Sequence, residues 1–417
     1  MHLVQDLQDL QERPATDVAL TGIDLFSPEG FRSGNQHPVW QHLRETAPVW
    51  WHEVPGQHGF WCVTRYADCE RVLKDHRTFS SEHGSILASV GVGDPAGGRT
   101  LSLMDPPRHT GLRSRTMRTF SHSVVRAKAE GIRARIRRLV DTCCDGQVDF
   151  ARTMSLLPMI VSGELLGIPE EYWQDITWWV NTSLAPEDPE YAAGRPVAQS
   201  LALAHHELFS RFAEVIGHRR RHPGTDLISL LLGWEDGQRR LDDRTVALNC
   251  YSFILGANST TPHVASHTLA ALIDRPEIWE TVAARPDLVP ALVEEGVRWS
   301  SPTHHLVRRA TADTTIGDVA LAQGDWVAVW TASANRDESV FTDPYAFDIR
   351  RSPNPHIGFG AGPHYCIGAP LARMALGSLF EELIRRLGSV EPAGPVAHLS
   401  SNWINGIVSM PITTKAR

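Results

Sequence analysis

The hydrophobic residues of this 417-residue chain follow two different spacings. From about residue 66 to residue 386 they recur mainly every three or four positions, which is the spacing of one face of a helix. Residues 48–66 and 308–335 instead alternate aromatic or β-branched residues with polar ones around Pro and Gly, a pattern typical of strands joined by turns. The two spacings predict a mainly α-helical protein with a minor β sheet.

The segments that separate the predicted helices and strands are short. No linker long enough to separate two domains is present, so we expect one domain over residues 26–417, preceded by an N-terminal extension over residues 1–25. Pro262 lies inside a helical pattern and should kink or loosen that helix, because proline lacks a backbone donor. The segments with helical spacing are 67–75, 123–144, 200–221, 245–274, 287–299 and 367–387.

Composition and charge narrow the classes of function. Forty basic and 48 acidic residues give a net charge of −8, which argues against a whole-protein affinity for nucleic acid or for an anionic membrane. The first residues lack a signal-peptide pattern, and no segment approaches about 20 uninterrupted apolar residues. We therefore expect a cytoplasmic protein. Its six cysteines show no CxxC spacing, so neither a disulfide framework nor a zinc knuckle is indicated.

One cysteine stands in an unusual frame. Cys366 lies in "FGAGPHYCIG", directly before an amphipathic helical pattern, so it is predicted at a helix N-terminus. The free N–H groups and the helix dipole there should lower the pKa of its thiol. Such a thiolate can be a nucleophile, with His364 as its base, or a soft metal ligand. The glycines around Cys366 favour a flat, bulky group lying against bare backbone, such as a heme.

Several motifs in one order make the chain similar to the bacterial cytochrome P-450 family. "FGAGPHYCIG" matches the heme-binding signature at Phe359, Gly360, Gly362, His364, Cys366 and Gly368. "EEGVR" supplies a Glu-x-x-Arg pair at Glu295 and Arg298, with Arg351 as its third partner, and "LMDPPRHTGLR", "ANRDESVFTDPYAFD" and "APLARMAL" complete the series. The resemblance covers residues 26–412. It implies the cytochrome P-450 fold, a single domain in which a long helix crosses a heme b cofactor.

The resemblance also assigns roles to single residues. Cys366 would be the axial thiolate ligand of the iron, whose electron donation favours O–O cleavage, with Phe359 beside the sulfur. Glu295, Arg298 and Arg351 would form a buried ion network that supports the cysteine loop. The residues implied in cofactor binding are His109, Arg113, Arg308, Phe359, His364, Cys366 and Gly368.

On the oxygen side of the heme the chain departs from the family pattern. Aligned on Thr260, which would be the oxygen-side alcohol, Ser259 occupies the place of the usual acid. The acid and the alcohol organise proton delivery, which a serine can relay through water but cannot supply from a carboxylate. Either Asn258 and ordered water take over this task, or the main reaction does not need the full relay. A third interpretation is that Ser259 is merely tolerated.

Two further segments have an implied role. Residues 108–138 hold nine arginines and one lysine against a single acid, Glu130. This is either a solvated helix face or, as the resemblance implies, the docking site of an acidic ferredoxin that is served by a ferredoxin reductase. The glycine-rich stretch 84–98 resembles the family's loop over the substrate pocket. Its "GVGDPA" formally matches a dinucleotide motif, but no strand precedes it and no helix follows, so nucleotide binding is rejected.

Three functions follow from the resemblance. The first is a monooxygenase that uses O2 to hydroxylate or oxidise a small molecule, the second uses the same heme for oxidative coupling or cyclisation, and the third is a non-enzymatic heme-thiolate sensor. Asn258, Ser259 and three segments (177–181, 303–307 and 401–408) are predicted to line the substrate pocket, and their polar and aromatic residues favour a peptide-derived or polyketide secondary metabolite over a fatty chain. His304 and His305 are alternatively predicted to point away from the pocket.

Overall fold

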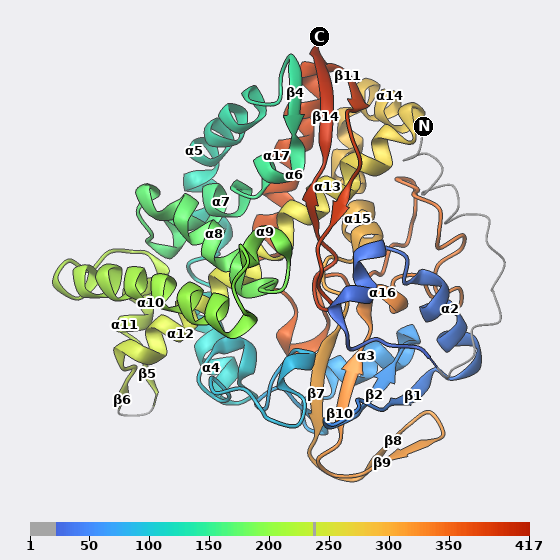
Figure 1. Cartoon of the computed structure of the whole chain (residues 1–417). Coiled ribbons are helices and arrows are strands. Elements are labelled where there is room, and N and C mark those ends of the chain that lie inside the picture. The colour runs from blue at the N-terminus through green and yellow to red at the C-terminus, as the bar shows by residue number, and fades with distance from the viewer. Residues whose placement is uncertain (1–21, 237–238) are drawn as a thin grey trace.

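Helices occupy most of the molecule in the computed structural model, which describes residues 22–236 and 239–417 (Figure 1). Most of the predicted extension, residues 1–25, lies outside the described residues, and its boundary stays a prediction. The longer helices are α2 (His37–Thr46), α3 (Tyr66–Lys74), α4 (Arg108–Thr116), α5 (His122–Asp141), α7 (Leu157–Leu166), α8 (Trp173–Leu184), α10 (Val197–Arg221), α12 (Asp243–Asn258), α13 (Thr261–Ile273), α14 (Pro276–Ala284), α15 (Val289–Ser300) and α17 (Ala369–Arg386). The shorter ones are η1 (Pro28–Ser33), η2 (Leu87–Ser89), η3 (Leu101–Leu103), α6 (Phe150–Met154), η4 (Glu170–Tyr172), α9 (Pro189–Ala192), α11 (Leu227–Leu232), η5 (Pro286–Leu288), α16 (Thr331–Ala334) and η6 (Gly362–His364).

The strands form one five-stranded sheet and several small ones. The main sheet has the order β1-β2-β10-β7-β3, and β10 pairs with β2 in parallel while its other pairs are antiparallel. The predicted hairpin around residue 56 is confirmed, since Val49 lies opposite Val63 and His52 opposite Phe60. The strands are β1 (Val49–His52), β2 (Phe60–Val63), β3 (Phe79–Ser80), β4 (Gly146–Asp149), β5 (Glu235–Asp236), β6 (Arg239–Arg240), β7 (Leu306–Ala310), β8 (Thr314–Ile316), β9 (Val319–Leu321), β10 (Trp326–Val329), β11 (Leu387–Pro392), β12 (Ala397–His398), β13 (Ile407–Ser409) and β14 (Pro411–Ala416).

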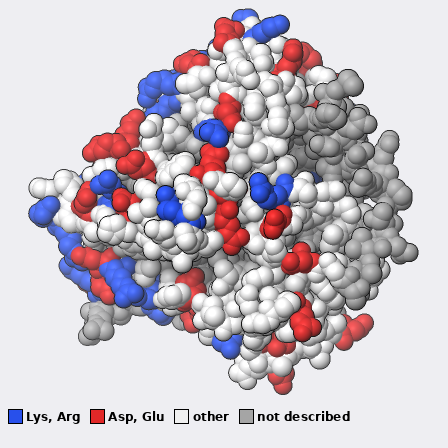
Figure 2. All heavy atoms as spheres, viewed as in Figure 1, with Lys and Arg blue, Asp and Glu red and all other residues white. Residues whose placement is uncertain are grey.

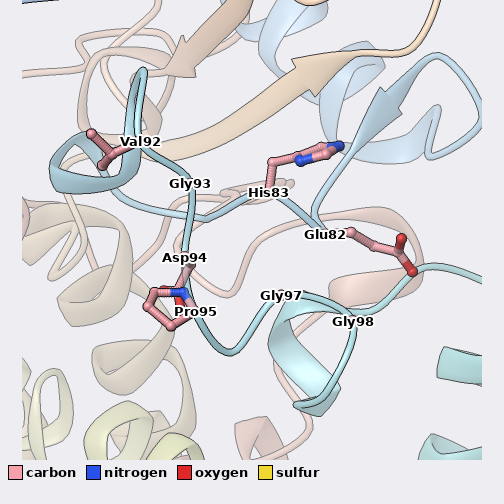
Figure 3. Close-up of a pocket in the computed structure, with 8 residues that line it drawn as sticks. All are labelled: Glu82, His83, Val92, Gly93, Asp94, Pro95, Gly97 and Gly98. Carbon is pink, nitrogen blue, oxygen red and sulfur yellow. The ribbon is translucent and has the colours of Figure 1, made fainter.

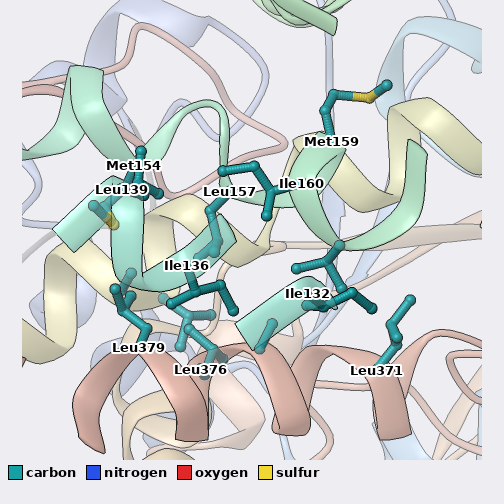
Figure 4. Close-up of a cluster of buried hydrophobic side chains, with 14 of the residues drawn as sticks. Ile132, Ile136, Leu139, Met154, Leu157, Met159, Ile160, Leu371, Leu376 and Leu379 are labelled. Carbon is teal, nitrogen blue, oxygen red and sulfur yellow. The ribbon is translucent and has the colours of Figure 1, made fainter. Parts of the chain in front are cut away.

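The largest hydrophobic core lies among α5, α7 and α17. Leu371 and Leu379 lie along one face of α17, the spacing that its sequence predicts, and both are buried in this core. Figure 4 shows them pointing toward Ile132 and Ile136 of α5, with Leu157 of α7 on the far side. This packing fixes the N-terminus of α17, and so the residues directly before it.

The helix predicted over residues 245–274 is two helices. α12 ends at Asn258 and α13 begins at Thr261, and the backbone of Thr260 between them leaves the helical region, with φ −129° and ψ −54°. Pro262 lies in the first turn of α13, where a missing N–H costs little because the first N–H groups of a helix have no partner within it. The predicted loosening near Pro262 is thus a complete break, placed just before the proline.

A second sheet closes the far end of the helical part. The strand β14, close to the end of the chain, lies between β11 and β4, in the order β11-β14-β4. In Figure 1 these strands run beside α17 at the top of the molecule. Segments from residues 146–149, 387–392 and 411–416 therefore meet in one sheet.

Candidate active site

The loop that carries Cys366 is held in place by backbone contacts. The Cys366 N–H donates to the Phe359 carbonyl at 2.8 Å, and Gly368, the residue that caps α17, follows two positions later. Gly360 and Gly362 have φ values of +73° and +69°, which favour glycine. A Cβ atom on Gly362 would lie 2.6 Å from the Leu73 carbonyl oxygen of α3, so this glycine is required by protein packing. The prediction that the glycines of this loop lie against a flat cofactor stays a prediction.

The Cys366 thiol does not have the lowered pKa that its sequence position predicts. Burial raises its pKa above the ordinary value, because the loss of water around the thiolate destabilises it more than the neighbouring groups stabilise it. The N–H groups of Gly368 and Ala369 and the positive charge of Arg113 act in the opposite direction, as a helix N-terminus should. The prediction is therefore corrected for the protein alone: an additional positive partner is needed to favour the thiolate.

Phe359 and two arginines surround this loop. The guanidinium carbon of Arg373 lies 4.5 Å from the centre of the Phe359 ring, which is a cation–π distance. Arg113 of α4 donates to the Tyr365 carbonyl at 2.6 Å, directly before the cysteine. The side of the cysteine loop is thus lined by positive charge.

Four cationic or imidazole side chains predicted to bind the cofactor meet beside the loop. The rings of His109 (α4) and His364 (η6) lie 4.3 Å apart, and the Nε2 atoms of both are buried without a hydrogen-bond partner in the described structure. Arg308 of β7 is buried and donates to the Val307 carbonyl, and none of the described carboxylates forms an ion pair with it. Arg113 is the fourth member, on the same helix as His109.

Burial and mutual repulsion lower the pKa values in this group. The pKa of His364 falls to about 2, first through burial and then through the charge of Arg308, while burial lowers the pKa of His109 to about 4. Burial likewise lowers the pKa of Arg308 to about 10. One carboxylate lies beside this group, since Asp105 Oδ1 is 4.0 Å from His364 Nε2. The basic side chains still outnumber it, and such an excess of buried donors fits a ligand with carboxylates at this position. The two propionates of heme b are such carboxylates, so the residues present fit the implied cofactor.

Across from the cysteine, the end of α12 presents Thr260. Its hydroxyl donates to the Gly256 carbonyl at 3.2 Å, one turn earlier, and Gly256 is exposed with open space where a side chain would stand. Asn258 and Ser259 are buried instead, and the Asn258 amide donates to the Ile254 carbonyl at 2.9 Å. Thr260 therefore shares the open face of the helix with Gly256, whereas the proton-delivery roles of Ser259 and Asn258 stay predictions.

The predicted ion network behind the cysteine loop is present. Arg298 and Glu295, both fully buried, form two hydrogen bonds of 2.7 and 2.8 Å, and Arg351 lies 3.3 Å from the same carboxylate. Arg298 also donates to the carbonyl of Asn335, whose side chain in turn accepts from the Ile357 N–H ahead of the cysteine loop. The network thus connects α15 to the segment that leads to Cys366.

Most polar groups predicted to contact the substrate bond to the protein itself. His305 accepts from the Leu87 N–H at 3.1 Å and donates to the Asn402 carbonyl at 3.1 Å, and His304 packs against Phe31. The alternative prediction, that both histidines point away from the pocket, is the one that these contacts favour. The side chains of Ser401, Asn402 and Asn405 likewise bond to backbone groups. The polar lining expected from residues 303–307 and 401–408 is therefore corrected.

The glycine-rich stretch 84–98 is an exposed loop. A cavity of about 420 Å³ lies between residues 82–83 and residues 92–98, as Figure 3 shows, and Val92 is 83% exposed. Gly91 and Gly93 have left-handed backbone angles, and the 3-10 helix η2 lies between them and the preceding strand β3. The rejection of a nucleotide-binding motif here stays a prediction.

Exposed arginines gather on α4, α5 and the segment between them. Arg115, Arg118, Arg126 and Arg133 are exposed and form no ion pair within the described structure. Lys128 forms an ion pair with Glu164, and Arg135 forms ion pairs with Glu164 and Glu170. Figure 2 shows basic side chains over the end of the molecule that carries α5, while acidic and basic groups are mixed across much of the visible face.

Two buried asparagines that connect distant segments were not predicted from the sequence. Asn249 of α12 and Asn335 are fully buried asparagines that bind backbone groups of distant segments. The sequence feature that could have indicated Asn249 is its amide side chain within a segment of helical, mainly apolar spacing. Among the residues described, no group of His, Cys, Asp and Glu side chains could hold a metal ion, and no helix has the length and apolarity needed to cross a membrane.

Comparison with known proteins defines the class. The cytochrome P450 family model matches residues 200–411. The chain is 33% identical over 400 residues to linalool 8-monooxygenase of Pseudomonas putida, covering 93% of this chain and 98% of that protein, and 32% identical over 414 residues to cytochrome P450 NovI of Streptomyces niveus, covering 97% and 99%. A Mycobacterium marinum cytochrome P450 in complex with pseudoionone superposes with a TM-score of 0.87 at 32% identity, covering 96% of this chain and 99% of that one.

The protein belongs to the cytochrome P450 family. It has the family's fold, binds heme b and is an oxidoreductase that acts on a small molecule with O2 and a redox partner. A second solved structure, P450 OxyD, which is involved in the biosynthesis of vancomycin-type antibiotics, superposes with a TM-score of 0.84 at 30% identity, covering 95% of this chain and all of that one.

Proposed function

We propose that this protein is a monooxygenase that inserts one oxygen atom of O2 into a small secondary metabolite. The observation that carries the proposal is the pairing of an open oxygen-side face at Gly256 and Thr260 with a cysteine loop flanked by unpartnered buried donors. A sensor needs only the cysteine loop and the donors. An alcohol beside the exposed Gly256 favours an enzyme.

The cofactor-binding residues have separate tasks. Cys366 would ligate the iron, Phe359 would shield its sulfur from water, and Gly368 would place a backbone N–H against the sulfur. His109, Arg113, Arg308 and His364 would hold the two propionates, which would complete the charge balance of this buried group. The heme, when bound, supplies the activation of O2.

Thr260 would hold a proton-bearing water on the open face. Its hydroxyl already donates to the Gly256 carbonyl, which leaves its oxygen free to accept a hydrogen bond from water. Ser259 brings no carboxylate to this position, so the proton would come through water from solvent. Because Ser259 departs from the acid of the family pattern, oxidative coupling at the same heme stays the second candidate.

The substrate class rests on similarity. The polar side chains that pointed to a polar metabolite bond inside the protein, so they no longer carry that argument. We propose a peptide-derived or polyketide metabolite because NovI, OxyD and EryK, the last solved with erythromycin B, are among the similar proteins. Linalool 8-monooxygenase and the pseudoionone complex favour a terpenoid as the competing class.

Electrons would arrive from an acidic ferredoxin reduced by its reductase. The exposed arginines of α4 and α5 provide the complementary charge, and Arg113 connects this surface to the residue before Cys366.

Turnover under labelled dioxygen tests the reaction type. The reconstituted enzyme, ferredoxin and reductase would be supplied with candidate peptide-derived, polyketide and terpenoid substrates selected by their binding spectra. One labelled oxygen atom in the product supports the proposal. A dehydrogenated or coupled product without label supports the second candidate, and heme binding without turnover of any substrate would support a sensor.

A further inference from the structure

We propose that Asn249 is a positioning residue that fastens the end of the access loop to α12 and limits how far the loop opens. The access loop is defined here as residues 84–103. The inference rests on the proposed function in one respect, namely that this loop borders the route by which substrates reach the heme.

Asn249 makes three hydrogen bonds from a fully buried position. Its Oδ1 accepts from the Leu101 N–H at 3.0 Å, and its Nδ2 donates to the Arg99 carbonyl at 3.0 Å and to the Thr245 carbonyl at 2.9 Å. Two of these bonds cross from α12 to the access loop, 148 and 150 residues away in the chain. An asparagine amide has both the donor and the acceptor that this backbone pair requires.

Neighbouring side chains on the same face of α12 repeat the connection. The guanidinium of Arg99 donates to the Thr245 hydroxyl at 2.9 Å, and the hydroxyls of Ser102 and Ser252 lie 2.9 Å apart. Positions 245, 249, 252 and 256 share one face of α12. The loop is therefore attached to the helical face that continues, one to three turns later, to the exposed Gly256, whose carbonyl accepts from the Thr260 hydroxyl.

The other end of the access loop is anchored separately. His305 accepts from the Leu87 N–H at 3.1 Å, and the Val307 N–H donates to the Ser85 carbonyl at 2.9 Å, so this end is fixed to the segment that leads into β7. Between the two anchors, the backbone hydrogen bonds of residues 90–98 join that segment mainly to itself or to residues 83–89. The part of the loop that borders the cavity in Figure 3 can move while both ends remain attached.

Removing the amide would leave a buried backbone N–H and a half-buried carbonyl without their partner. The Leu101 N–H and the Arg99 carbonyl lie against an apolar core that includes Leu101 and Met104, and they could be satisfied only by water or by local opening. Asn249→Leu, which keeps a side chain of similar size, should therefore open the loop end more often. Thermal stability alone does not report on this change, because many core substitutions lower it.

The experiment compares Asn249→Leu with the wild type and with Ser266→Ala, a matched loss of one buried hydrogen bond on α13, where Ser266 donates to the Pro262 carbonyl at 3.0 Å. Hydrogen exchange of residues 99–104 and stopped-flow binding of 4-phenylimidazole to the holoenzyme are measured. We expect exchange, and both the association and dissociation rates of this probe, to rise about tenfold in Asn249→Leu, the effect of losing one to two hydrogen bonds. Ser266→Ala should leave all three unchanged.

Carbon monoxide binding is a second control, because a diatomic ligand needs little opening. Unchanged 4-phenylimidazole rates and protected amides at residues 99–104 would overturn the proposal, as would an equal effect in Ser266→Ala. If Asn249→Leu does not fold, the same measurements are made on the double variant Ser102→Ala/Thr245→Val. This variant lacks the Ser102–Ser252 and Arg99–Thr245 hydrogen bonds that flank Asn249. Failure of the proposed function is separate: it would appear as an absence of oxygen insertion, with the loop exchange still raised.

Discussion

At the scale of single residues, burial determines the protonation of the candidate site. Burial is the largest cause of the pKa change at Cys366, Arg308 and His364, and in each case it favours the neutral form. Cys366 and His364 therefore need an oppositely charged partner to become ionised at neutral pH, whereas Arg308, whose pKa is about 10, is already charged there. A ferric ion for the thiolate and two carboxylates for the basic groups would meet that need together.

Cys366→Ser should abolish the thiolate-type absorption of the ferrous carbon monoxide complex. An alcohol is a poor ligand for iron at neutral pH, so any heme that still binds would lack the sulfur ligand. The measurement is the difference spectrum of the reconstituted variant. A wild-type spectrum from Cys366→Ser would exclude Cys366 as the ligand.

Glu295→Ala should destabilise the protein by about 3–5 kcal/mol, because it leaves two buried guanidiniums, Arg298 and Arg351, without their shared carboxylate. Urea unfolding followed by fluorescence measures the loss. Glu382→Ala is the matched control, since its ion pairs to Arg385 and Arg386 lie nearer the surface. Equal losses in the two variants would contradict the importance assigned to the buried network.

The residue-scale errors of sequence reasoning share one cause. His305 looked available for a substrate because its partners, Leu87 and Asn402, lie 218 and 97 residues away along the chain. The pKa of Cys366 was misjudged because helix position is visible in a sequence and burial of a loop is not. The packing reason for Gly362 could not be predicted, because its neighbour, the Leu73 carbonyl, belongs to a helix that is distant in the sequence.

At the scale of elements, hydrophobic periodicity predicted which helices and strands form but not the residues at which they end. The hairpin of β1 and β2, the strand-rich segment 308–335 and helices such as α5, α15 and α17 all lie where hydrophobic spacing predicts them. For the junction of α12 and α13 the sequence predicts only a kink or loosening at Pro262, not a complete break, although residues 258–261 are all polar. Its location depends on Thr260 bonding back to Gly256, which only the folded helix reveals.

Pro262→Ala should lower the free energy of unfolding by about 0.5–1 kcal/mol and leave the break in place. The proline sits in the first turn of α13, where it fits the backbone and restricts the unfolded chain. Chemical unfolding of the variant checks this sign. A gain in stability would mean instead that the proline interrupts a helix that would otherwise be continuous.

At the scale of the whole molecule, the uneven distribution of charge matters more than the net charge of −8. Arg115→Glu/Arg118→Glu should slow reduction by an acidic ferredoxin by about tenfold at low salt while substrate binding survives. The difference should shrink at about 1 M salt, where charges are screened over roughly 3 Å. Stopped-flow reduction measures both, with Arg32→Glu, an exposed arginine of η1, as the control. An unchanged rate at low salt would place docking elsewhere.

Buried neutral histidines should make the fold sensitive to acid. Burial lowers the pKa of His305 to about 3, that of His267 to about 3 and that of His263 to about 4, all below the value near 6.5 of an unfolded histidine. Their contribution to stability is fully present above pH 6.5 and is lost as the pH falls toward these values, because only the unfolded chain takes up the protons. His305 alone should cost about 1.4 kcal/mol per pH unit between pH 6 and 4.

The measurement is the free energy of unfolding at several pH values for the wild type and for His305→Gln. The variant removes one titrating group, so its stability should fall less steeply with decreasing pH, whatever its absolute stability. Parallel curves would show that His305 is already charged in the folded protein or is accessible to protons.

The small sheet β11-β14-β4 has a consequence for how the chain is made. β4, at residues 146–149, has its ladder partner in β14, which is synthesised some 260 residues later. At the usual rates of about 5–20 residues per second, the ribosome needs roughly 13–50 s to cover that distance. During this interval the nascent chain carries β4 as an unfinished edge next to α5, and molecular chaperones that cover such edges should raise the yield of folded enzyme in cells.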